Sequence, residues 1–240
     1  ILSRLVGSEM CIRDSKIASF ETVDLRLIDY VARTGKPMII STGMASEDEI
    51  REAVDTARAG GCSELALLTC VSSYPAMPSD YNLSRIVDMR ERFQTVVGLS
   101  DHTLDNTCAI ASITLGGCII EKHFTLDRKG GGADDSFSLE PNDMKNLCES
   151  SLAAWQSIGS PEYGTKSTEK NNAQYRRSLY FVKSLKKGDV IKIDDIRSVR
   201  PGFGLPTKMF DSVVGSEVNC NVSYGDPVKL ADIIMKSDID

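Results

Sequence analysis

The sequence predicts an α/β fold with an all-parallel β-sheet, followed by a small β-rich domain. Over residues 16–158, short apolar runs alternate with helix-length segments of amphipathic pattern. After residue 175 this alternation stops, and short β-like segments are separated by turns that contain Gly and Pro. A chain of 240 residues is long enough for one large domain or two modest ones.

Five strand–helix pairs are expected in the first domain. In chain order, the expected strands are residues 16–21, 38–43, 64–70, 95–102 and 118–124, and the expected helices are residues 24–34, 46–59, 83–93, 104–117 and 142–158. Ser46, followed three residues later by Glu49, predicts a capping box at the start of the second helix. Because a helix follows each strand, neighbouring strands are expected to run parallel.

Right-handed crossovers curl such a sheet toward a barrel. A (β/α)8 barrel needs eight strands, so five units predict a partial TIM barrel over residues 16–160. Residues 1–15 show no helix or strand period and resemble translated adaptor sequence. We therefore expect residues 1–15 to be a non-native or disordered tail, and we expect the chain to be truncated at its N-terminus by about three units.

The rest of the chain is predicted to form a linker over residues 161–175 and a β-rich domain over residues 176–240. The linker is polar and contains Gly, Ser, Pro, Thr and Lys. Within the domain, the pattern predicts strands at residues 178–182 and 190–193, a turn at residues 186–189, a short helix from Asp194 and a rigid Pro/Gly loop at residues 200–204.

Composition argues against several classes of partner. The net charge is −6 and the sequence has no basic block, which disfavours nucleic acid and anionic membranes. The apolar runs are too short to span a bilayer. Seven cysteines without CxxC spacing are typical of buried free thiols in a reducing compartment, so a cytoplasmic protein is expected.

The two histidines of the sequence, His102 and His123, each end an apolar run. In a parallel strand–helix–strand unit, both would emerge at the carboxyl edge of one sheet, where α/β folds place their chemistry. Two imidazoles at that edge suit a divalent metal: imidazole binds manganese, iron, cobalt or zinc, and a site dominated by water and carbonyl oxygens favours manganese or magnesium. The alternative is that each histidine fills a hydrogen-bonding niche in the core.

Each expected strand of the first domain ends in polar residues. In strand order these are Lys16, Ser19 and Glu21; Ser41 and Thr42; Ser72, Ser73 and Tyr74; Ser100, Asp101 and His102; and Glu121, Lys122 and His123. Five such endings predict a site, and a lysine among hydroxyls suits a small, doubly anionic ligand. The alternative is that these side chains only satisfy backbone groups of the loops.

A loop with three consecutive glycines, residues 127–135, follows the last strand. Such a loop can approach a ligand closely, and Asp134 or Asp135 would then hydrogen-bond its hydroxyl or amide groups. A solvated turn is the alternative.

The polar residues at the strand ends lie in motifs that resemble those of the sialic acid synthase family. The motifs are KIASFE (residues 16–21), ISTGM (40–44), CVSSYPA (70–76), GLSDHT (98–103) and EKHF (121–124). Residues 177–204 resemble the family's C-terminal antifreeze-like (SAF) domain. Within the family, SSYPA (72–76), FSLEP (137–141) and SLYFV (178–182) look most like the pseudaminic acid synthase branch, with N-acetylneuraminate or legionaminate synthase as the alternative.

The resemblance implies a C–C bond-forming transferase that condenses phosphoenolpyruvate with an open-chain acetamido sugar and releases phosphate. For the pseudaminate branch, the sugar would be a 2,4-diacetamido-2,4,6-trideoxy-hexose and the product a nine-carbon 2-keto acid. The family's pattern also implies a divalent metal, with manganese expected and magnesium or cobalt as alternatives. It further implies a domain-swapped homodimer.

Carried over by position, the resemblance assigns roles to individual residues. The implied catalytic residues are Lys16, Glu21, His102 and His123, of which His102 and His123 hold the metal; phosphoenolpyruvate would bind Lys16, Ser19, Ser41, Ser72 and Ser100; and the sugar would contact Glu21, Tyr74, Asp134 and, from the partner's SAF domain, Arg200.

Two departures from the family pattern qualify these roles. The family's first three strands, which carry further catalytic groups, have no counterpart here. Ser72 also stands where the neuraminate branch has asparagine. The chain alone is therefore expected to be inactive, and a non-catalytic remnant with an open sheet edge is the competing interpretation. A metal-dependent hydrolase is less favoured, because it would need more metal ligands than two histidines supply.

Overall fold

The computed structural model describes residues 13–236. The chain divides into two compact units after Ser160, and each is described by itself. Of the expected tail, residues 1–12 lie outside the described residues. Ser15 already belongs to the first strand.

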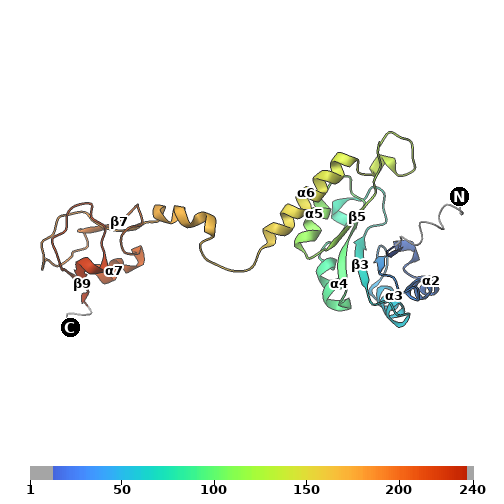
Figure 1. The fold of residues 1–240 in the computed structure, drawn as a ribbon, viewed down its shortest axis with the longest axis horizontal. Helices are drawn as coiled ribbons and strands as arrows, with labels where there is room; N and C mark the ends of the chain where they lie inside the picture. The colour runs from blue at the N-terminus through green and yellow to red at the C-terminus, as the bar shows by residue number, and fades with distance from the viewer. Residues whose placement is uncertain (1–12, 237–240) are drawn as a thin grey trace. The chain divides into compact units, whose positions relative to one another are not determined.

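The first unit is built around a five-stranded parallel sheet with the strands in sequence order (Figure 1). Its strands are β1 (Ser15–Ile17), β2 (Met38–Ser41), β3 (Leu65–Cys70), β4 (Val96–Asp101) and β5 (Ile119–Lys122). Its helices are α2 (Leu25–Ala32), α3 (Glu47–Ala59), α4 (Arg85–Phe93), α5 (Thr107–Thr114) and α6 (Pro141–Ile158), with short 3-10 turns η1 (Ser19–Glu21), η2 (Pro78–Asp80) and η3 (Asp135–Phe137).

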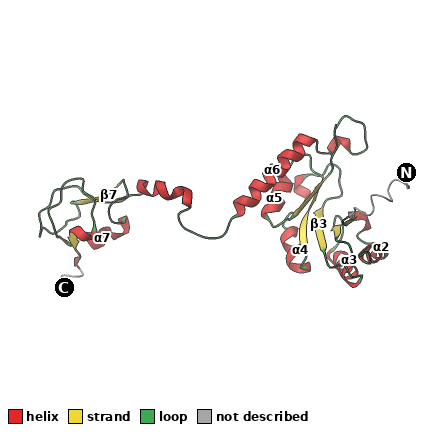
Figure 2. Cartoon of the chain, viewed as in Figure 1, coloured by secondary structure: helices red, strands yellow, loops and turns green. Residues whose placement is uncertain are grey.

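Helices cover one side of this sheet, as Figure 2 shows. All six residues of β3 are buried, as expected for a central parallel strand. The main core joins apolar residues of β1–β4 with one face of α2, α3 and α4; it includes Ile28, Ile40, Ile50 and Ile86. The predicted capping box is confirmed, because Ser46 Oγ accepts the Glu49 N–H and Glu49 accepts the Ser46 N–H. Such a cap stabilises a helix by about 1 kcal/mol.

The sheet curls strongly enough to bring together side chains from its two outermost strands. Lys16 Nζ on β1 lies 3.6 Å from Glu121 Oε1 on β5, although three strands separate them. The predicted partial barrel is confirmed by this curvature and by the strand order. After β5 the chain returns along the edge of the sheet, where Phe124 and Leu139 form an isolated parallel bridge.

The second unit is a small domain whose apolar core includes Leu179, Phe181, Val213 and Val228. Its elements are η4 (Ser167–Tyr175), β6 (Ser178–Phe181), β7 (Ile196–Val199), η5 (Thr207–Met209), α7 (Phe210–Val213), β8 (Glu217–Val218), η6 (Leu230–Asp232) and β9 (Ile233–Ile234). The strands form two antiparallel pairs, β6–β7 and β8–β9.

Local expectations for this unit need three corrections. Residues 167–175 of the expected linker form the 3-10 helix η4. Residues 190–193 are not a strand, because only Val190 forms a bridge there. No helix starts at Asp194; instead, the buried Asp195 carboxylate accepts the Lys192 N–H and the Lys183 ammonium, each at 2.8 Å, and this turn leads into β7.

Two further properties bear on the expectations from composition. Among residues 13–236, no helix combines the length and the apolar character needed to cross a membrane. The described cysteines are free, but they are not all buried. Cys62, Cys70 and Cys108 are buried, whereas Cys118, Cys148 and Cys220 are exposed.

Candidate active site

The two histidines lie side by side at the carboxyl edge of the sheet. Their ring centroids are 5.3 Å apart, with the ring planes inclined at 62°. Strand alternation explains this, because His102 and His123 each follow a strand by one residue, and the register of β4 and β5 pairs Asp101 with Lys122 just before them. A small pocket of about 180 Å³ is lined by Ser100, His102, Glu121, Lys122 and His123.

His102 is held with one nitrogen free. Its Nδ1 lies 2.7 Å from the Val71 carbonyl oxygen, and Cys70 Sγ lies 4.0 Å from the same nitrogen. Because a carbonyl can only accept, Nδ1 carries the proton and donates it. Nε2 of the neutral ring then keeps its lone pair, which is the state a metal ligand requires.

His123 faces a carboxylate at a longer distance. Its Nδ1 lies 3.4 Å from Asp134 Oδ2, an ion-pair contact and not a hydrogen bond, and the ring presents Nε2 to the other side. Asp135 instead forms hydrogen bonds within the glycine loop and with Thr125. Its carboxylate accepts the Gly132 N–H at 2.8 Å and the Thr125 hydroxyl at 2.7 Å, and the Thr125 bond is the largest cause that lowers the pKa of Asp135. Asp134 therefore faces the site, and Asp135 closes the glycine loop.

Two aromatic rings border the histidines. The Tyr74 ring centroid lies 4.3 Å from that of His102, and the Phe137 centroid lies 5.2 Å from that of His123. Burial is the largest cause that raises the pKa of Tyr74, so its hydroxyl remains a proton donor at neutral pH. Together the rings form an apolar wall beside the two imidazoles.

A chain of polar contacts crosses the inner face of the sheet. Glu121 Oε1 accepts the Ser100 hydroxyl at 2.8 Å and lies 3.6 Å from Lys16 Nζ. Lys16 also donates to its neighbour's carbonyl, that of Ile17, at 3.0 Å. The Ser100 proton is thus engaged by Glu121, and an anion that approaches Lys16 competes with the same carboxylate.

Serine hydroxyls converge where β1, β2 and β3 end. Ser19 Oγ accepts the Gly43 N–H at 3.0 Å. A Cβ atom at Gly43 would lie 2.7 Å from Ser19 Oγ and 2.6 Å from Ser72 Oγ, so both hydroxyls face the same point. Within the described residues, the buried hydroxyls of Ser41 and Ser72 have no hydrogen-bond partner. Unpartnered buried hydroxyls are costly unless a ligand completes them.

Two other polar residues after the strands bind backbone carbonyls, one within β3 and one, as the alternative interpretation expected, within a loop. The Thr42 hydroxyl donates to the Leu68 carbonyl at 3.1 Å, and the Ser73 hydroxyl donates to the Pro75 carbonyl at 3.2 Å. A larger pocket of about 510 Å³ lies at the opposite edge of the sheet, near the strand starts Met38, Leu65 and Val96. Barrels of this type place chemistry at the carboxyl edge, so we assign the site to the smaller pocket.

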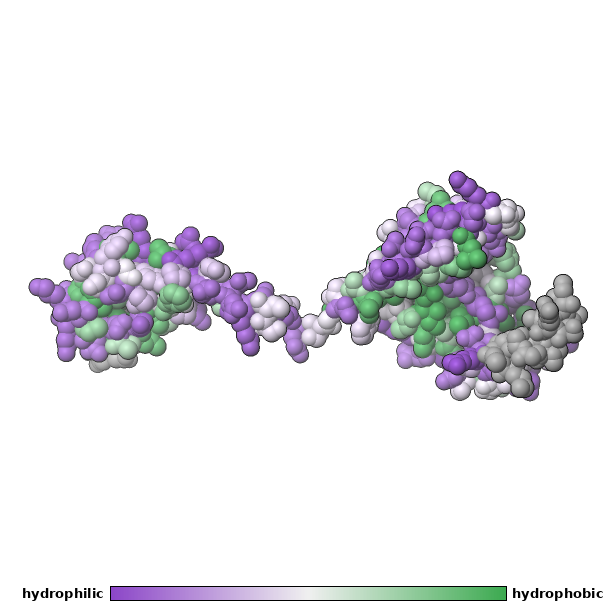
Figure 3. Space-filling view, turned by 45° about the horizontal axis from the view of Figure 1, so that its top comes forward, coloured by the Kyte–Doolittle hydropathy of each residue, from purple (hydrophilic) through white to green (hydrophobic). Residues whose placement is uncertain are grey.

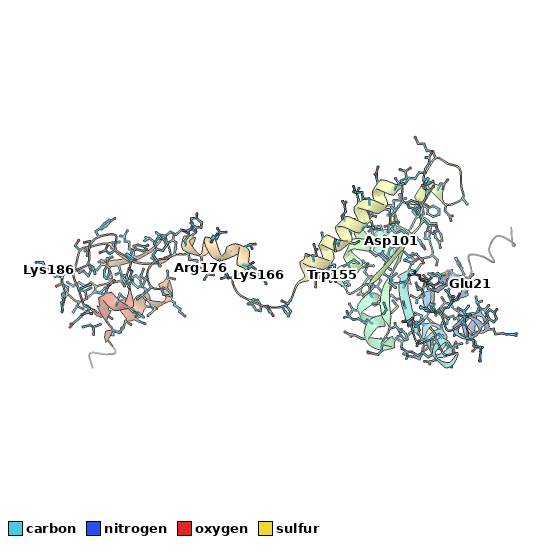
Figure 4. All side chains as sticks on the ribbon, viewed as in Figure 1. Glu21, Asp101, Trp155, Lys166, Arg176 and Lys186 are labelled. Carbon is cyan, nitrogen blue, oxygen red and sulfur yellow. The ribbon has the colours of Figure 1, made fainter. Side chains whose placement is uncertain are left out.

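Two predicted residues stand apart from this cluster. Glu21 is exposed on η1 and, among the described residues, forms no ion pair or hydrogen bond with the other candidates (Figure 4). Arg200 is exposed in the second unit, after β7.

Two residues of the cluster, Glu121 and Phe137, were not assigned a role from the sequence. Glu121 was named only among the polar strand ends, although it lies two residues before His123 and shares its face of β5. Phe137 carried no such signal, because it reaches His123 only through the returning glycine loop.

Comparison with known proteins places this arrangement in a family. The NeuB family model matches residues 5–163, and the SAF domain model matches residues 176–234. The chain is 36% identical over 220 residues to the pseudaminic acid synthase of Helicobacter pylori, with 91% of this chain and 64% of that protein covered. It is 37% identical over 215 residues to the N,N'-diacetyllegionaminic acid synthase of Legionella pneumophila, with 88% and 60% covered.

A solved structure shows the same fold. The spore coat polysaccharide biosynthesis protein SpsE of Bacillus subtilis is 32% identical, with a TM-score of 0.60 over 98% of this chain and 70% of that chain. The chain spans just under two thirds of the length of the Helicobacter and Legionella synthases named above. The resemblance seen in the motifs is confirmed: the chain belongs to the NeuB family and carries a SAF domain after its partial barrel.

Proposed function

We propose that this chain carries the catalytic edge of a nonulosonic acid synthase of the pseudaminate type, acting in the cytoplasm. The enol carbon of phosphoenolpyruvate would bond to the aldehyde carbon of a 2,4-diacetamido-2,4,6-trideoxy-hexose. Water would supply the oxygen of the new ketone, and phosphate would leave. The observation that carries the proposal is the pair of imidazoles, 5.3 Å apart, on the same curled sheet as a cluster of serine hydroxyls and one lysine.

Phosphoenolpyruvate would lie between Lys16 and the serine cluster. The free hydroxyls of Ser41 and Ser72 and the exposed part of Lys16 offer donors to its phosphate and carboxylate oxygens. Ser19 would contribute through the hydroxyl that already holds Gly43. On binding, Lys16 would exchange its contact with Glu121 for one with the phosphate, and Glu121 would keep the hydrogen bond from Ser100.

The histidines fit a divalent metal, because Nδ1 of His102 is bound to the Val71 carbonyl and Nδ1 of His123 faces Asp134, which leaves Nε2 of each ring for a metal. Within the described residues, no cluster of three or more His, Cys, Asp or Glu side chains is arranged to hold a metal. Two nitrogens with water and substrate oxygens suit manganese, with magnesium or cobalt as alternatives, whereas catalytic zinc usually has three protein ligands. When bound, the metal would polarise the sugar carbonyl.

The sugar would lie on the aromatic side of the pocket. Tyr74 and Phe137 offer apolar contact, and the Tyr74 hydroxyl and Asp134 offer hydrogen bonds. Glu21 and, from a partner subunit, Arg200 would complete the contacts with hydroxyl and acetamido groups. That contact requires a homodimer in which SAF domains are exchanged.

The test is release of inorganic phosphate from phosphoenolpyruvate, measured with each candidate sugar. We expect the 2,4,6-trideoxy acceptor to be preferred over N-acetylmannosamine, and a form extended to the length of the relatives to turn over faster than the 240-residue chain. A preference for a legionaminate-type or neuraminate-type acceptor would support the alternative branch, as does the likeness to the Legionella enzyme. No phosphate release by either form with any of these sugars would overturn the proposal.

Gly43→Ala is expected to weaken phosphoenolpyruvate binding by about 10- to 100-fold, the equivalent of one charge-assisted hydrogen bond. The new methyl group would lie within 3 Å of both Ser19 Oγ and Ser72 Oγ, so the two hydroxyls must move apart. Calorimetric titration with phosphoenolpyruvate measures the effect. Mn²⁺ affinity serves as the control and should stay unchanged, and unchanged phosphoenolpyruvate affinity would contradict the serine assignment.

A further inference from the structure

A buried ion pair lies directly behind the two histidines. Lys122 Nζ lies 3.0 Å from Asp101 Oδ2, and the two side chains are 2% and 0% exposed. The same ammonium donates to the Thr103 carbonyl at 2.8 Å and to the Asp105 carbonyl at 2.7 Å. All three donors of the lysine are therefore used, and two of them hold the loop that follows His102.

This pair joins the two strands that carry the histidines. Asp101 precedes His102, Lys122 precedes His123, and the two are partners in the register of β4 and β5. Because successive side chains alternate across a strand, the side chains of Asp101 and Lys122 leave the sheet on the face opposite those of His102 and His123, although Lys122 also contributes to the lining of the small pocket. Figure 4 marks Asp101, the last residue of β4. The ion pair thus joins the ends of β4 and β5 directly beside the two histidines.

Tyr81 contacts the backbone of His102. Its hydroxyl, on a side chain buried in the core, accepts the His102 N–H at 2.6 Å. Asp101 Oδ1 accepts the Thr103 N–H at 2.9 Å. The peptide groups on both sides of His102 are therefore held by side chains, while its ring is held by the Val71 carbonyl.

We infer that Asp101, Lys122 and Tyr81 are positioning residues that fix the separation of the two imidazoles for a shared cation. The inference rests on the proposed metal site. A buried ion pair adds little to the stability of a fold, because apolar side chains of similar volume usually stabilise it equally well. It does restrict conformation, because the three directed hydrogen bonds from the Lys122 ammonium hold the loop after His102 in one arrangement.

The test uses the purified 240-residue chain and two readouts. The first is the Mn²⁺ dissociation constant, from the electron paramagnetic resonance signal of free Mn²⁺. The second is the ¹⁵N spectrum of metal-free, histidine-labelled protein, in which two rings are the only labelled side chains. For Tyr81→Phe, and for the double variant Asp101→Leu with Lys122→Met, we expect the Mn²⁺ dissociation constant to rise about 10- to 100-fold, as for other supporting contacts around metal ligands.

The double variant leaves no unpaired buried charge, so it should fold even where Lys122→Met alone does not. In both variants the ring signals of His102 should shift or split before metal is added. Lys183→Met is the matched control, because it breaks the Lys183–Asp195 pair of the second unit and should change neither readout.

The possible outcomes distinguish the proposed metal site from the positioning role of Asp101, Lys122 and Tyr81. If the unmodified chain binds Mn²⁺ and both variants bind it equally well with unshifted ring signals, the positioning role is wrong and the metal site stands. If the unmodified chain binds no Mn²⁺, the metal site is wrong. Shifted ring signals in the variants would then still establish that these residues position His102, whereas unshifted signals would overturn that too.

Discussion

Replacing His123 with alanine is expected to raise the Mn²⁺ dissociation constant more than about 100-fold, since even changes to groups that support metal ligands cost about 10- to 100-fold. His123 would supply one of two nitrogen ligands, and water cannot restore its position beside His102. The side chain is 31% exposed, so its removal should leave the fold intact. In a form with synthase activity, metal-dependent turnover should be lost.

A graded variant separates ligation from general damage to the pocket. Asp134→Asn keeps the imidazole but weakens the acceptor at Nδ1, so its effect on the Mn²⁺ dissociation constant should be smaller, about 10-fold. Circular dichroism checks that both variants stay folded. Undiminished Mn²⁺ affinity in His123→Ala would contradict the ligand role.

Replacing Lys16 with methionine is expected to weaken phosphoenolpyruvate binding about 10- to 100-fold, the range of one lost hydrogen bond between charged groups. The change removes the cation beside Glu121 and leaves that carboxylate without its ion-pair partner, so repulsion of the anion adds to the loss. Because this interaction is electrostatic and partly exposed, the difference should shrink as salt concentration rises.

Lys36→Met is the matched control for this measurement. Lys36 precedes β2 and so lies at the opposite edge of the sheet, with the same side chain and no expected role in binding. Calorimetric titration of both variants should show a loss only in Lys16→Met. Equal affinities in the two variants would contradict the placement of the anion.

The fold was predictable because its signals are local. The alternation of apolar runs with helix-length segments, the capping box at Ser46 and the glycine stops all lie within a few residues of the elements they define. The prediction was weaker where loops override propensity. The helix expected over residues 104–117 is shortened to α5, Thr107–Thr114, because Asp105 accepts the Thr107 N–H and Lys122 binds the carbonyls of the preceding loop.

The site was predictable where position along a strand decides it. His102 and His123 meet because both directly follow neighbouring parallel strands. Contacts that depend on curvature or on a returning loop were not predictable. Lys16 meets Glu121 only because the sheet curls across five strands, and Phe137 meets His123 only because the chain folds back along β5.

The sequence pattern also did not predict which apolar residues of a helix remain exposed. Helix α6 exposes Leu152, Trp155 and Ile158, although its pattern predicts an ordinary amphipathic helix. Figure 3 shows apolar side chains on the surface of this unit. Whether a face is covered depends on what packs against it, which periodicity along one helix does not encode.

Titration of the histidine-labelled chain with Co²⁺, followed by proton NMR, tests most directly whether one cation is shared by two imidazoles. If both rings bind through Nε2, two Nδ1–H protons should move together far outside the diamagnetic range and saturate at one Co²⁺ per chain. Movement of a single ring N–H, or of none, would contradict the account.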